Sequence, residues 1–349
     1  MAPANIRLNP VGALVCVAVA LCIVIYIFGF PDWFRSEPRI SMKELLSVSI
    51  ELAKRGGTKV HEIKQQNSLE NKVKGKTAEG ADELLTKGDI ESHRAIVYGF
   101  AKAFPGLKVK SEEHDLKPID LSTIPEVNKH NPEVEEAIVS DQSIAFKDIT
   151  VWIDPLDATK EYTEDLNQYV TTMVCVAVNG AATIGVIHKP FVTGSDQTSW
   201  AWVGYGTSKN LQKLKEVKKT ADKTESTKVH KIIVSRSHSG TVKRVAETAF
   251  GKNTEVIPAG GAGYKTLEVI KGNADAYTHV TAIKKWDICA GNAILSAMDG
   301  KMTTLEGNYI TYSPNENVKN EHGLLATISD HFSLYLKKLA SAAEEYLLL

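Results

Sequence analysis

Apolar and polar positions along this chain predict an N-terminal apolar segment followed by helices and strands. Residues 11–30 form an apolar run without a charged side chain. At roughly 1.5 Å per residue, such a run is long enough to span a bilayer core. No Ala-x-Ala-like site precedes Pro31, so we expect an uncleaved signal anchor rather than a cleaved signal peptide. The basic residues on either side are few and mixed with acids, so charge leaves the orientation of the span open.

The next segment predicts a helix that packs one face against a core. Over residues 41–66, Leu45, Val48 and Leu52 recur at helical spacing and Ser41 is placed to cap the helix. Gly56-Gly57 interrupts the pattern and weakens its second half. The residues that follow predict a basic loop, a second helix, a short strand and an irregular polar stretch, over 72–88, 90–104, 107–110 and 115–148.

The pattern in the second half of the chain predicts first a hairpin and then alternating strands and helices. Two apolar stretches, 171–178 and 182–188, flank Asn179-Gly180, a strong hairpin signal, and residues 200–203 continue the sheet. The lysine-rich stretch 209–228 is typical of a solvated hinge. Beyond it, alternation predicts a parallel sheet with crossovers, with strands over 231–234, 255–257 and 274–280 and helices over 241–250, 288–298 and 331–349.

The length of the chain favours about two domains, and the alternation of predicted strands and helices favours an α/β protein. With 349 residues, 43% of them hydrophobic, the chain has ample material for a core. We expect a tail, anchor and linker over 1–40, an α+β part over 41–228 and an α/β part over 229–349. A net charge of −1 gives no indication of a nucleic-acid partner. The cysteines have no spacing typical of a disulfide framework or a zinc site, so we expect buried free thiols at Cys16, Cys22, Cys175 and Cys289.

The main candidates for binding a metal ion and a phosphate lie in residues 149–162. We expect a buried strand over 149–153, followed by a turn. Pro155 should end the hydrogen bonds to the neighbouring strand, because proline has no N–H to donate. The turn carries Asp154 and Asp157 and can aim both carboxylates, together with the Leu156 carbonyl, at one hard cation such as Mg²⁺. A helix then begins near Thr159, capped by Asp157 or Thr159, and its free N–H groups suit a phosphate. The alternative is an ordinary surface turn, which the apolar strand leading into two acids disfavours.

Further acids and a glycine-rich loop extend this candidate site. Glu112 follows the predicted strand 107–110 and is a candidate third metal carboxylate, although adjacent acids such as Glu112-Glu113 are usually solvated. Residues 259–265 are rich in glycine and open a helix, which suits either a phosphate cradle or a tight turn. Asp287 stands where the cap of the helix over 288–298 is expected.

These motifs together resemble a known family. Residues 154–159 (DPLDAT) and 286–291 (WDICAG) are similar to the two signatures of the inositol monophosphatase superfamily of metal-dependent, lithium-sensitive phosphatases. Glu112-Glu113 and Asp89 match the acidic residues that precede them in that family. Residues 235–240, 260–265 and 284–287 resemble its bisphosphate nucleotidase branch, and the similarity covers roughly residues 41–330.

The resemblance implies a layered αβαβα sandwich and removal of the 3′-phosphate from adenosine 3′,5′-bisphosphate, giving AMP and phosphate. It implies two or three Mg²⁺ ions held by Glu112, Asp154, the Leu156 carbonyl, Asp157 and Asp287. Asp89 and Thr159 would activate the attacking water. The nucleotide and its 5′-phosphate would be held by Ser235, His238, Gly261 and Lys265.

The apolar N-terminal run extends the resemblance to Golgi members of this branch. It implies a type II membrane protein whose catalytic part is lumenal and clears the by-product of sulfotransferases. Two alternatives stay open: an inositol phosphate phosphatase of the same superfamily, and a membrane protein that binds nucleotides without catalysis.

Overall fold

The computed structural model of this chain describes residues 9–28, 37–76, 82–115, 119–220, 229–236, 239–251, 254–328 and 332–347. The chain divides into two units, Met1–Arg39 and Ile40–Leu349. The boundary expected near residue 228, inside the second unit, stays a prediction.

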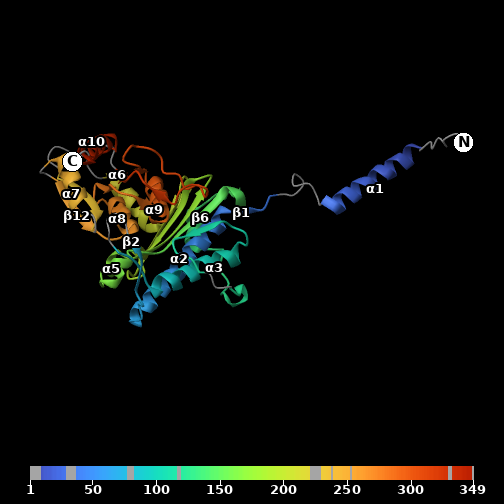
Figure 1. Cartoon of the computed structure of the whole chain (residues 1–349), viewed down its shortest axis with the longest axis horizontal. Helices are drawn as coiled ribbons and strands as arrows, with labels where there is room; N and C mark the ends of the chain where they lie inside the picture. Colours follow the sequence, from blue (N-terminus) through green and yellow to red (C-terminus); the bar gives the residue numbers. More distant parts are fainter. Residues whose placement is uncertain are drawn as a thin grey trace. The chain divides into compact units, whose positions relative to one another are not determined.

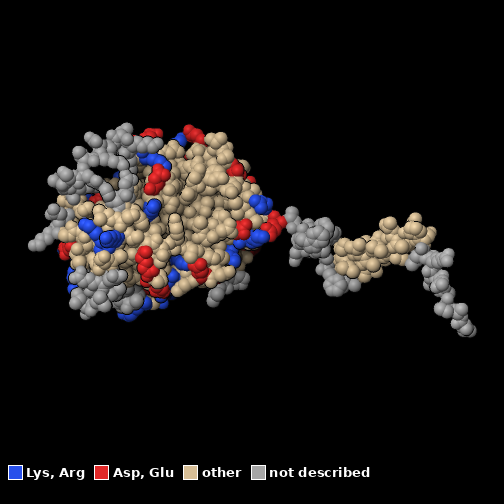
Figure 2. Space-filling view, turned by 90° about the horizontal axis from the view of Figure 1, so that it is seen from above, with Lys and Arg blue, Asp and Glu red and all other residues tan. Residues whose placement is uncertain are grey.

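The first unit contains helix α1 (Pro10–Phe28), which carries no charged side chain (Figure 2). Among the residues that the structure describes, no helix combines the length and the apolar character needed to cross a membrane. The transmembrane helix predicted over 11–30 is therefore not supported. Positions 29 and 30 of the predicted span lie outside the described residues.

The first large sheet of the second unit is built around strand β6 (Ile149–Asp157). Its six strands in the described part run in the order β10-β9-β8-β7-β6-β4, antiparallel except for the β4–β6 pair. The other strands are β4 (Val109–Ser111), β7 (Thr171–Val178), β8 (Ala181–His188), β9 (Thr198–Trp202) and β10 (Gly206–Thr207). The predicted hairpin is confirmed, because Asn179 and Gly180 turn between β7 and β8 with positive φ values.

Helices α2 (Met42–Gln65) and α3 (Lys87–Ala103) cover one face of this sheet (Figure 1). The predicted cap is confirmed, since the Ser41 hydroxyl accepts a hydrogen bond from the Glu44 N–H at 3.0 Å. The helix also continues through Gly56-Gly57 instead of breaking there. A Cβ at Gly57 would lie 2.3 Å from the His188 ring. The glycine therefore lets α2 pack closely against β8.

The second large sheet mixes parallel and antiparallel strands. In the described part, β12, β11 and β13 pair in parallel, whereas β17 is antiparallel to both β13 and β15. The prediction of parallel pairing is therefore confirmed for the three predicted strands, while the antiparallel strands β15 and β17 were not predicted. The bounds are β11 (His230–Ser235), β12 (Thr254–Ala259), β13 (Ala276–His279), β15 (Lys301–Thr303) and β17 (Leu324–Thr327).

Helices α8 (Ala262–Lys271) and α9 (Lys285–Ala297) lie between the two sheets. Helix α9 packs on β6 to β9 of the first sheet and on β15 and β17 of the second. Helices α7 (Ser239–Phe250) and α10 (Phe332–Leu347) pack on each other, and α7 lies against β11 and β12 on the outer face of the second sheet. The predicted αβαβα sandwich is confirmed.

Smaller elements correct two predictions. The stretch 72–88, expected to be a loop, contains the antiparallel pair β2 (Lys72–Lys76) and β3 (Asp82–Leu85), and α3 begins at Lys87. The expected hinge begins with helix α6 (Lys209–Thr220), and residues 221–228 lie outside the described part. The remaining elements are β1 (Arg39–Ser41), η2 (Leu121–Thr123), α4 (Pro132–Ala137), β5 (Ser143–Ala145), η3 (Phe146–Asp148), α5 (Thr159–Thr163), η4 (Asn167–Tyr169), η5 (Ser195–Gln197), β14 (Ile283–Lys284) and β16 (Lys319–Asn320).

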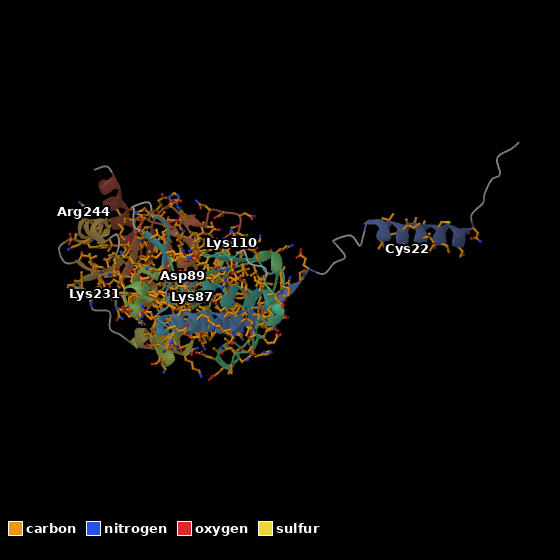
Figure 3. All side chains as sticks on the ribbon, turned by 60° about the horizontal axis from the view of Figure 1, so that its bottom comes forward. Cys22, Lys87, Asp89, Lys110, Lys231 and Arg244 are labelled. Carbon is orange, nitrogen blue, oxygen red and sulfur yellow. A yellow bond between two sulfur atoms is a disulfide. The ribbon has the colours of Figure 1, made fainter. Side chains whose placement is uncertain are left out.

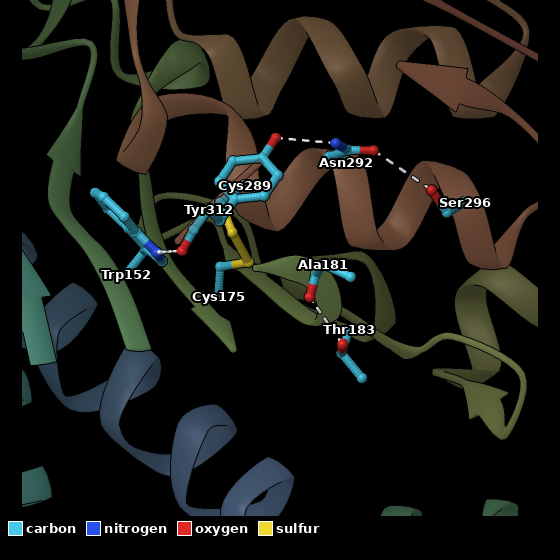
Figure 4. The surroundings of a disulfide bond; sticks show 8 residues. All are labelled: Trp152, Cys175, Ala181, Thr183, Cys289, Asn292, Ser296 and Tyr312. Atoms are coloured by element: carbon cyan, nitrogen blue, oxygen red, sulfur yellow. Dashed lines mark hydrogen bonds between the residues drawn. A yellow bond between two sulfur atoms is a disulfide. The ribbon is translucent and has the colours of Figure 1, made fainter. Parts of the chain in front are cut away.

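A disulfide joins the first sheet to the central helices. Cys175 on β7 is bonded to Cys289 on α9, 114 residues away, and both are buried (Figure 4). Near it, the Trp152 indole donates to the Tyr312 carbonyl at 3.0 Å. The prediction of buried free thiols is therefore wrong for this pair, which packing brings together. It is also wrong in part for Cys16 and Cys22, which are free but exposed on α1.

Removing the disulfide should destabilise the second unit. Because the bond closes a long loop, we expect Cys175→Ala with Cys289→Ala to lower the free energy of unfolding by about 2–4 kcal/mol. Denaturant unfolding monitored by tryptophan fluorescence measures this. Cys16→Ala is the matched control, because Cys16 is free. Equal stability of the double variant and the parent would show that the bond does not constrain the fold.

Candidate functional site

Three carboxylates from different elements converge at one end of the first sheet. Glu112 directly follows β4, Asp154 lies in β6, and Asp287 lies in the first turn of α9. Each offers an oxygen within 4.8 Å of the others. Glu112 is held here because its N–H donates to the Ile153 carbonyl at 3.1 Å, which prolongs the parallel pairing of β4 and β6. Asp287 is the third residue of α9 and Lys284 takes the cap position, so the prediction of Asp287 as the cap is wrong.

Electrostatics make this carboxylate cluster (Glu112, Asp154, Asp287) a strong candidate for a cation site. Burial, followed by the negative charges of the other acids, raises the pKa of Asp154 and of Asp287 well above the ordinary range. Burial also raises the pKa of Glu112, although the nearby ammonium of Lys74 opposes the shift. A site with oxygen donors alone and several negative charges fits Mg²⁺.

Lys74 is a member of the site that the sequence analysis missed. From strand β2, its ammonium contacts Glu112 Oε1 at 2.7 Å and also pairs with Glu113. Burial would lower the pKa of Lys74, but the charges and hydrogen bonds of Glu112 and Glu113 together outweigh burial and raise that pKa. The hairpin β2–β3 therefore supplies a positive charge to the cluster. The only signal in the sequence is the basic composition of residues 72–76.

The Asp157 side chain forms its hydrogen bonds with residues outside the carboxylate cluster. Asp157 Oδ1 accepts a hydrogen bond from the Ala262 N–H at 3.1 Å, and Oδ2 accepts one from the Gly263 N–H at 2.8 Å. Thr171 also donates to Oδ2 at 3.2 Å. Asp157 thus binds the N-terminus of α8, an arrangement favoured by the helix dipole. Its role as a metal ligand stays a prediction.

The turn after Asp154 differs from the one expected. Strand β6 continues through Pro155 to Asp157, with the ladder to β7 interrupted between Asp154 and Asp157. Ala158 adopts a left-handed φ of 70° and occupies the cap position of α5, so neither predicted residue caps that helix. These bends present the Thr159 side chain toward Asp89.

Asp89 and Thr159 form a hydrogen-bonded pair beside the cluster. The Thr159 hydroxyl lies 3.0 Å from Asp89 Oδ1 and 3.1 Å from the Leu156 carbonyl oxygen. The other oxygen of Asp89 accepts from the Thr86 N–H at 2.7 Å and from the Thr86 hydroxyl at 2.6 Å. Asp89 lies inside the folded unit (Figure 3), and burial raises its pKa to about 7. The pair is suited to proton transfer near neutral pH.

A pocket of about 260 Å³ opens beside the cluster. It is lined by Asp157 and Asp287 and by three of the predicted nucleotide residues, Ser235, Gly261 and Lys265. His238, the fourth, lies outside the described residues. The pocket also contains residues that the sequence analysis did not select, among them Lys76, Tyr277, His279, Lys284 and Lys319.

Two residues define the floor of this pocket. Gly261 has a φ of 64°, and a Cβ there would lie 2.7 Å from the Tyr169 carbonyl oxygen and 2.9 Å from Asp157 Oδ2. Lys265 is buried, lies 3.4 Å from the Ala259 carbonyl oxygen and stands over the Tyr277 ring. Burial lowers its pKa to about 8, although the charge of Asp157 opposes the shift. The floor therefore requires glycine at 261 and holds a lysine close to Asp157.

The raised pKa values predict how pH and Mg²⁺ jointly affect stability. The folded protein holds protons on Glu112, Asp154, Asp287 and Asp89 that the unfolded chain releases above about pH 4. The stability that these protons contribute is therefore lost as pH rises above about 4, and the contribution of Asp89 is lost as pH passes through its folded pKa of about 7. Once deprotonated, the acids bind Mg²⁺ more tightly.

We expect the gain in melting temperature on adding Mg²⁺ to grow from about pH 5 to about pH 7.5. Burial lowers the pKa of His93 and of His188 to about 4, so these histidines make the protein more stable as pH rises. They do so equally in chelator and in Mg²⁺, and the difference in melting temperature between the two conditions therefore reports on the acids. Differential scanning fluorimetry in chelator and in Mg²⁺ measures it. A gain that stays constant or shrinks with pH would contradict the prediction, and Asp154→Asn should weaken the dependence.

Comparisons with known proteins agree with this arrangement. Residues 41–344 match the model of the inositol monophosphatase family. The chain is 44% identical over 354 residues to "Inositol monophosphatase 3" of Danio rerio, covering 97% of this chain and 98% of that protein. It is 43% identical over 364 residues to "Golgi-resident adenosine 3′,5′-bisphosphate 3′-phosphatase" of Mus musculus, with the same two coverages, 97% and 98%.

A solved structure supports the fold alone. The extragenic suppressor protein suhB from Bartonella henselae superposes with a TM-score of 0.60 at 17% identity, covering 86% of this chain and 98% of that one. The match to the family model spans the whole sandwich, including β4, β6 and α9, which carry the carboxylate cluster. The chain belongs to the inositol monophosphatase family.

Proposed function

We propose that this chain is a Mg²⁺-dependent phosphoric monoester hydrolase that removes the 3′-phosphate of adenosine 3′,5′-bisphosphate to give AMP and phosphate. The observation that carries the proposal is the carboxylate cluster beside the Asp89–Thr159 pair, both next to a pocket lined with lysines. The name of the mouse relative supports the substrate. In the Golgi, this reaction would clear the by-product of sulfotransferases.

The residues suit two or three Mg²⁺ ions. Glu112, Asp154 and the Leu156 carbonyl would hold one ion, and Asp154, Asp157 and Asp287 a second. Asp157 keeps this capacity because its Oδ1 accepts one hydrogen bond, from the Ala262 N–H, and has a second lone pair. When bound, Mg²⁺ neutralises phosphate charge and lowers the pKa of a coordinated water.

The Asp89–Thr159 pair would move the proton of the attacking water. Asp89 Oδ1 accepts the Thr159 hydrogen, which leaves the Thr159 oxygen with lone pairs for the water. As the water oxygen attacks phosphorus and the bond from phosphorus to the 3′ oxygen breaks, one water proton would pass to Thr159 Oγ1 and the Thr159 proton to Asp89. The 3′ oxygen would leave as an alkoxide and take up a proton from solvent, which gives AMP. A threonine hydroxyl alone is a poor base, so Asp89, with a pKa of about 7, is the acceptor. Thr86 holds Asp89 in the required orientation through two hydrogen bonds.

The nucleotide would lie in the pocket beside the cluster. Ser235 and Lys265 contribute polar groups, and Gly261 keeps the backbone open to the ligand. His238 completes the predicted set. A base and ribose placed there would bring the ester bond of the 3′-phosphate to the carboxylates at the pocket's floor.

Two observations support a Golgi location. Relatives at 42–43% identity are named Golgi-resident. The Cys175–Cys289 disulfide is typical of proteins that mature in an oxidising compartment, as the secretory lumen is. The single-pass type II orientation, with the catalytic part in the lumen, stays a prediction from the apolar run over 11–30, because no helix among the described residues has the length and apolar character to span a membrane.

An inositol phosphate substrate is the second candidate, because the zebrafish relative is named an inositol monophosphatase. We expect the purified full chain to hydrolyse adenosine 3′,5′-bisphosphate faster than inositol 1-phosphate. Activity should be lost in excess chelator and inhibited by lithium. Phosphate release from both substrates measures this, with Asp154→Asn as the inactive control. Faster hydrolysis of inositol 1-phosphate, or full activity in chelator, would overturn the proposal.

Substitutions at Thr159 test the proton path. We expect Thr159→Val, which keeps the shape and removes the hydroxyl, to lower kcat by about 10²-fold or more. Thr159→Ser keeps the hydroxyl and should retain most of the activity. Circular dichroism of both variants controls for folding. If the valine variant turned over at the parent rate, the hydroxyl would have no part in the reaction.

A further inference from the structure

Helix α5, which carries Thr159, is too short to hold its own position. It has five residues, Thr159–Thr163 (green in Figure 1), and it follows Ala158, whose left-handed φ of 70° is unusual for a residue with a Cβ atom. No side chain caps its N-terminus. Isolated helices of this length are not stable in water, so contacts with other elements must hold α5 in place. The Thr159 hydroxyl depends on those contacts to stay 3.0 Å from Asp89 Oδ1.

Contacts on two sides hold α5. On the side of the first sheet, the buried Tyr162 donates from its hydroxyl to the Val60 carbonyl oxygen of α2 at 2.8 Å. On the side of the second sheet, the Arg236 guanidinium donates from Nη1 to Glu161 Oε1 and to Glu164 Oε2, both at 3.0 Å. Arg236 directly follows β11, and Glu164 is the C-cap of α5. These two ion pairs therefore attach α5 to the carboxyl end of β11.

The carboxylate of Glu161 is buried against a loop of the second sheet. A Cβ at Gly260 would lie 2.5 Å from Glu161 Cδ, so glycine lets the carboxylate lie directly on the backbone. The Glu161 side chain is 10% exposed, whereas that of Glu164 is 37% exposed. Breaking a buried ion pair costs more than breaking an exposed one, because it leaves a charge without its partner. Of the two carboxylates, Glu161 therefore depends more strongly on Arg236.

The other end of this ion pair lies beside the pocket. The Arg236 N–H donates to the Ala259 carbonyl oxygen at 3.2 Å and continues the pairing of β11 with β12. Ser235, which precedes Arg236, and Gly261, which lies two residues after Ala259, both line the pocket. Arg236 itself does not line it in the described part of the chain. The ion pair therefore joins the helix that carries Thr159 to residues of the pocket.

We propose that Arg236 is a positioning residue for hydrolysis, which acts through Glu161 to set where Thr159 stands relative to the pocket. The proposal rests on the proposed function in giving the Thr159 hydroxyl a part in the reaction, and it adds what keeps that hydroxyl in place. A misplaced reacting group slows the chemical step more than it weakens substrate binding. Loss of Arg236 should therefore lower kcat and leave KM nearly unchanged.

The first test is a pair of substitutions at Arg236. We expect Arg236→Gln to lower kcat for adenosine 3′,5′-bisphosphate by about tenfold or more, with KM changed by less than about twofold. Arg236→Lys should restore most of kcat, because Arg236 uses a single nitrogen for both carboxylates and an ammonium can take its place. Phosphate release by the full chain in Mg²⁺ measures both constants. A lowered melting temperature with kcat unchanged would mean that Arg236 only supports the fold, and would overturn the proposal.

Two variants on α5 provide a matched comparison. Glu161→Gln keeps the packing on Gly260 and should lower kcat as Arg236→Gln does. Glu164→Gln is the control, because its carboxylate lies at the same distance from the same nitrogen but is more exposed, so kcat should stay close to that of the parent. Equal kcat values for the two α5 variants would contradict a special role of the buried pair.

Glu161 also acts on a lysine of the pocket. Burial lowers the pKa of Lys265 to about 8, and the charges of Asp157 and then of Glu161 oppose that shift. Glu161→Gln therefore weakens the support for a positive charge on Lys265, whereas Arg236→Gln leaves the Glu161 carboxylate in place. An effect through Lys265 on nucleotide binding would appear in KM. A rise in KM without a fall in kcat would therefore overturn the proposal.

A double-mutant cycle tests whether Arg236 acts through Thr159. In the background of Thr159→Val, which has no hydroxyl to position, Arg236→Gln should lower kcat by less than about twofold. If Arg236→Gln does not fold, Glu161→Gln takes its place in the cycle. Losses that multiply would show that Arg236 acts independently of Thr159, which would overturn this proposal and leave the proton path intact.

The remaining outcomes separate this proposal from the proposed function. If Thr159→Val turned over at the parent rate, the proton path would be wrong, and the positioning role of Arg236 would fall with it. If the parent hydrolysed inositol 1-phosphate and not adenosine 3′,5′-bisphosphate, the adenosine substrate would be wrong. Losses that do not multiply in the same cycle on inositol 1-phosphate would then still support the role of Arg236.

Discussion

The repulsion among three clustered carboxylates, of which Asp154 is buried and Glu112 and Asp287 are half-buried, is the constraint on which the site depends. Glu112, Asp154 and Asp287 come from a strand end, a strand and a helix start, and the fold brings their oxygens within 4.8 Å of one another. Such a cluster is costly unless positive charge is supplied. The chain supplies part of it through Lys74, and Mg²⁺ suits the remainder. The Mg²⁺ ions that suit catalysis would therefore also stabilise the fold.

The parts of the fold that depend on local pattern were predictable from the sequence. The capping hydroxyl of Ser41, the Asn179-Gly180 turn and the strand leading to Asp154 need only neighbouring residues. Their order, with the two family motifs, also implied the αβαβα sandwich. The hairpin β2–β3 was missed because lysine and glycine have low strand propensity, and pairing alone makes those residues strands.

Features that depend on distant partners could not be predicted in the same way. The sequence predicted Asp157 as a metal ligand. In the structure Asp157 accepts hydrogen bonds from Thr171 and from two N–H groups of α8, and α8 lies more than 100 residues further along the chain. Cys175 and Cys289 are 114 residues apart, and spacing carries no information on their pairing. The family resemblance predicted that Asp89 and Thr159 act together. Their 3.0 Å hydrogen bond could be observed only in the structure.

The Cys175–Cys289 bond also limits how the catalytic unit can move. It attaches β7 of the first sheet to α9, the helix that carries Asp287 and packs on the second sheet. A hinge between the two sheets would therefore open between α9 and the second sheet, because the bond holds α9 to β7. Asp287 would then move together with Asp154 of the first sheet, and the distance between these two carboxylates would be kept.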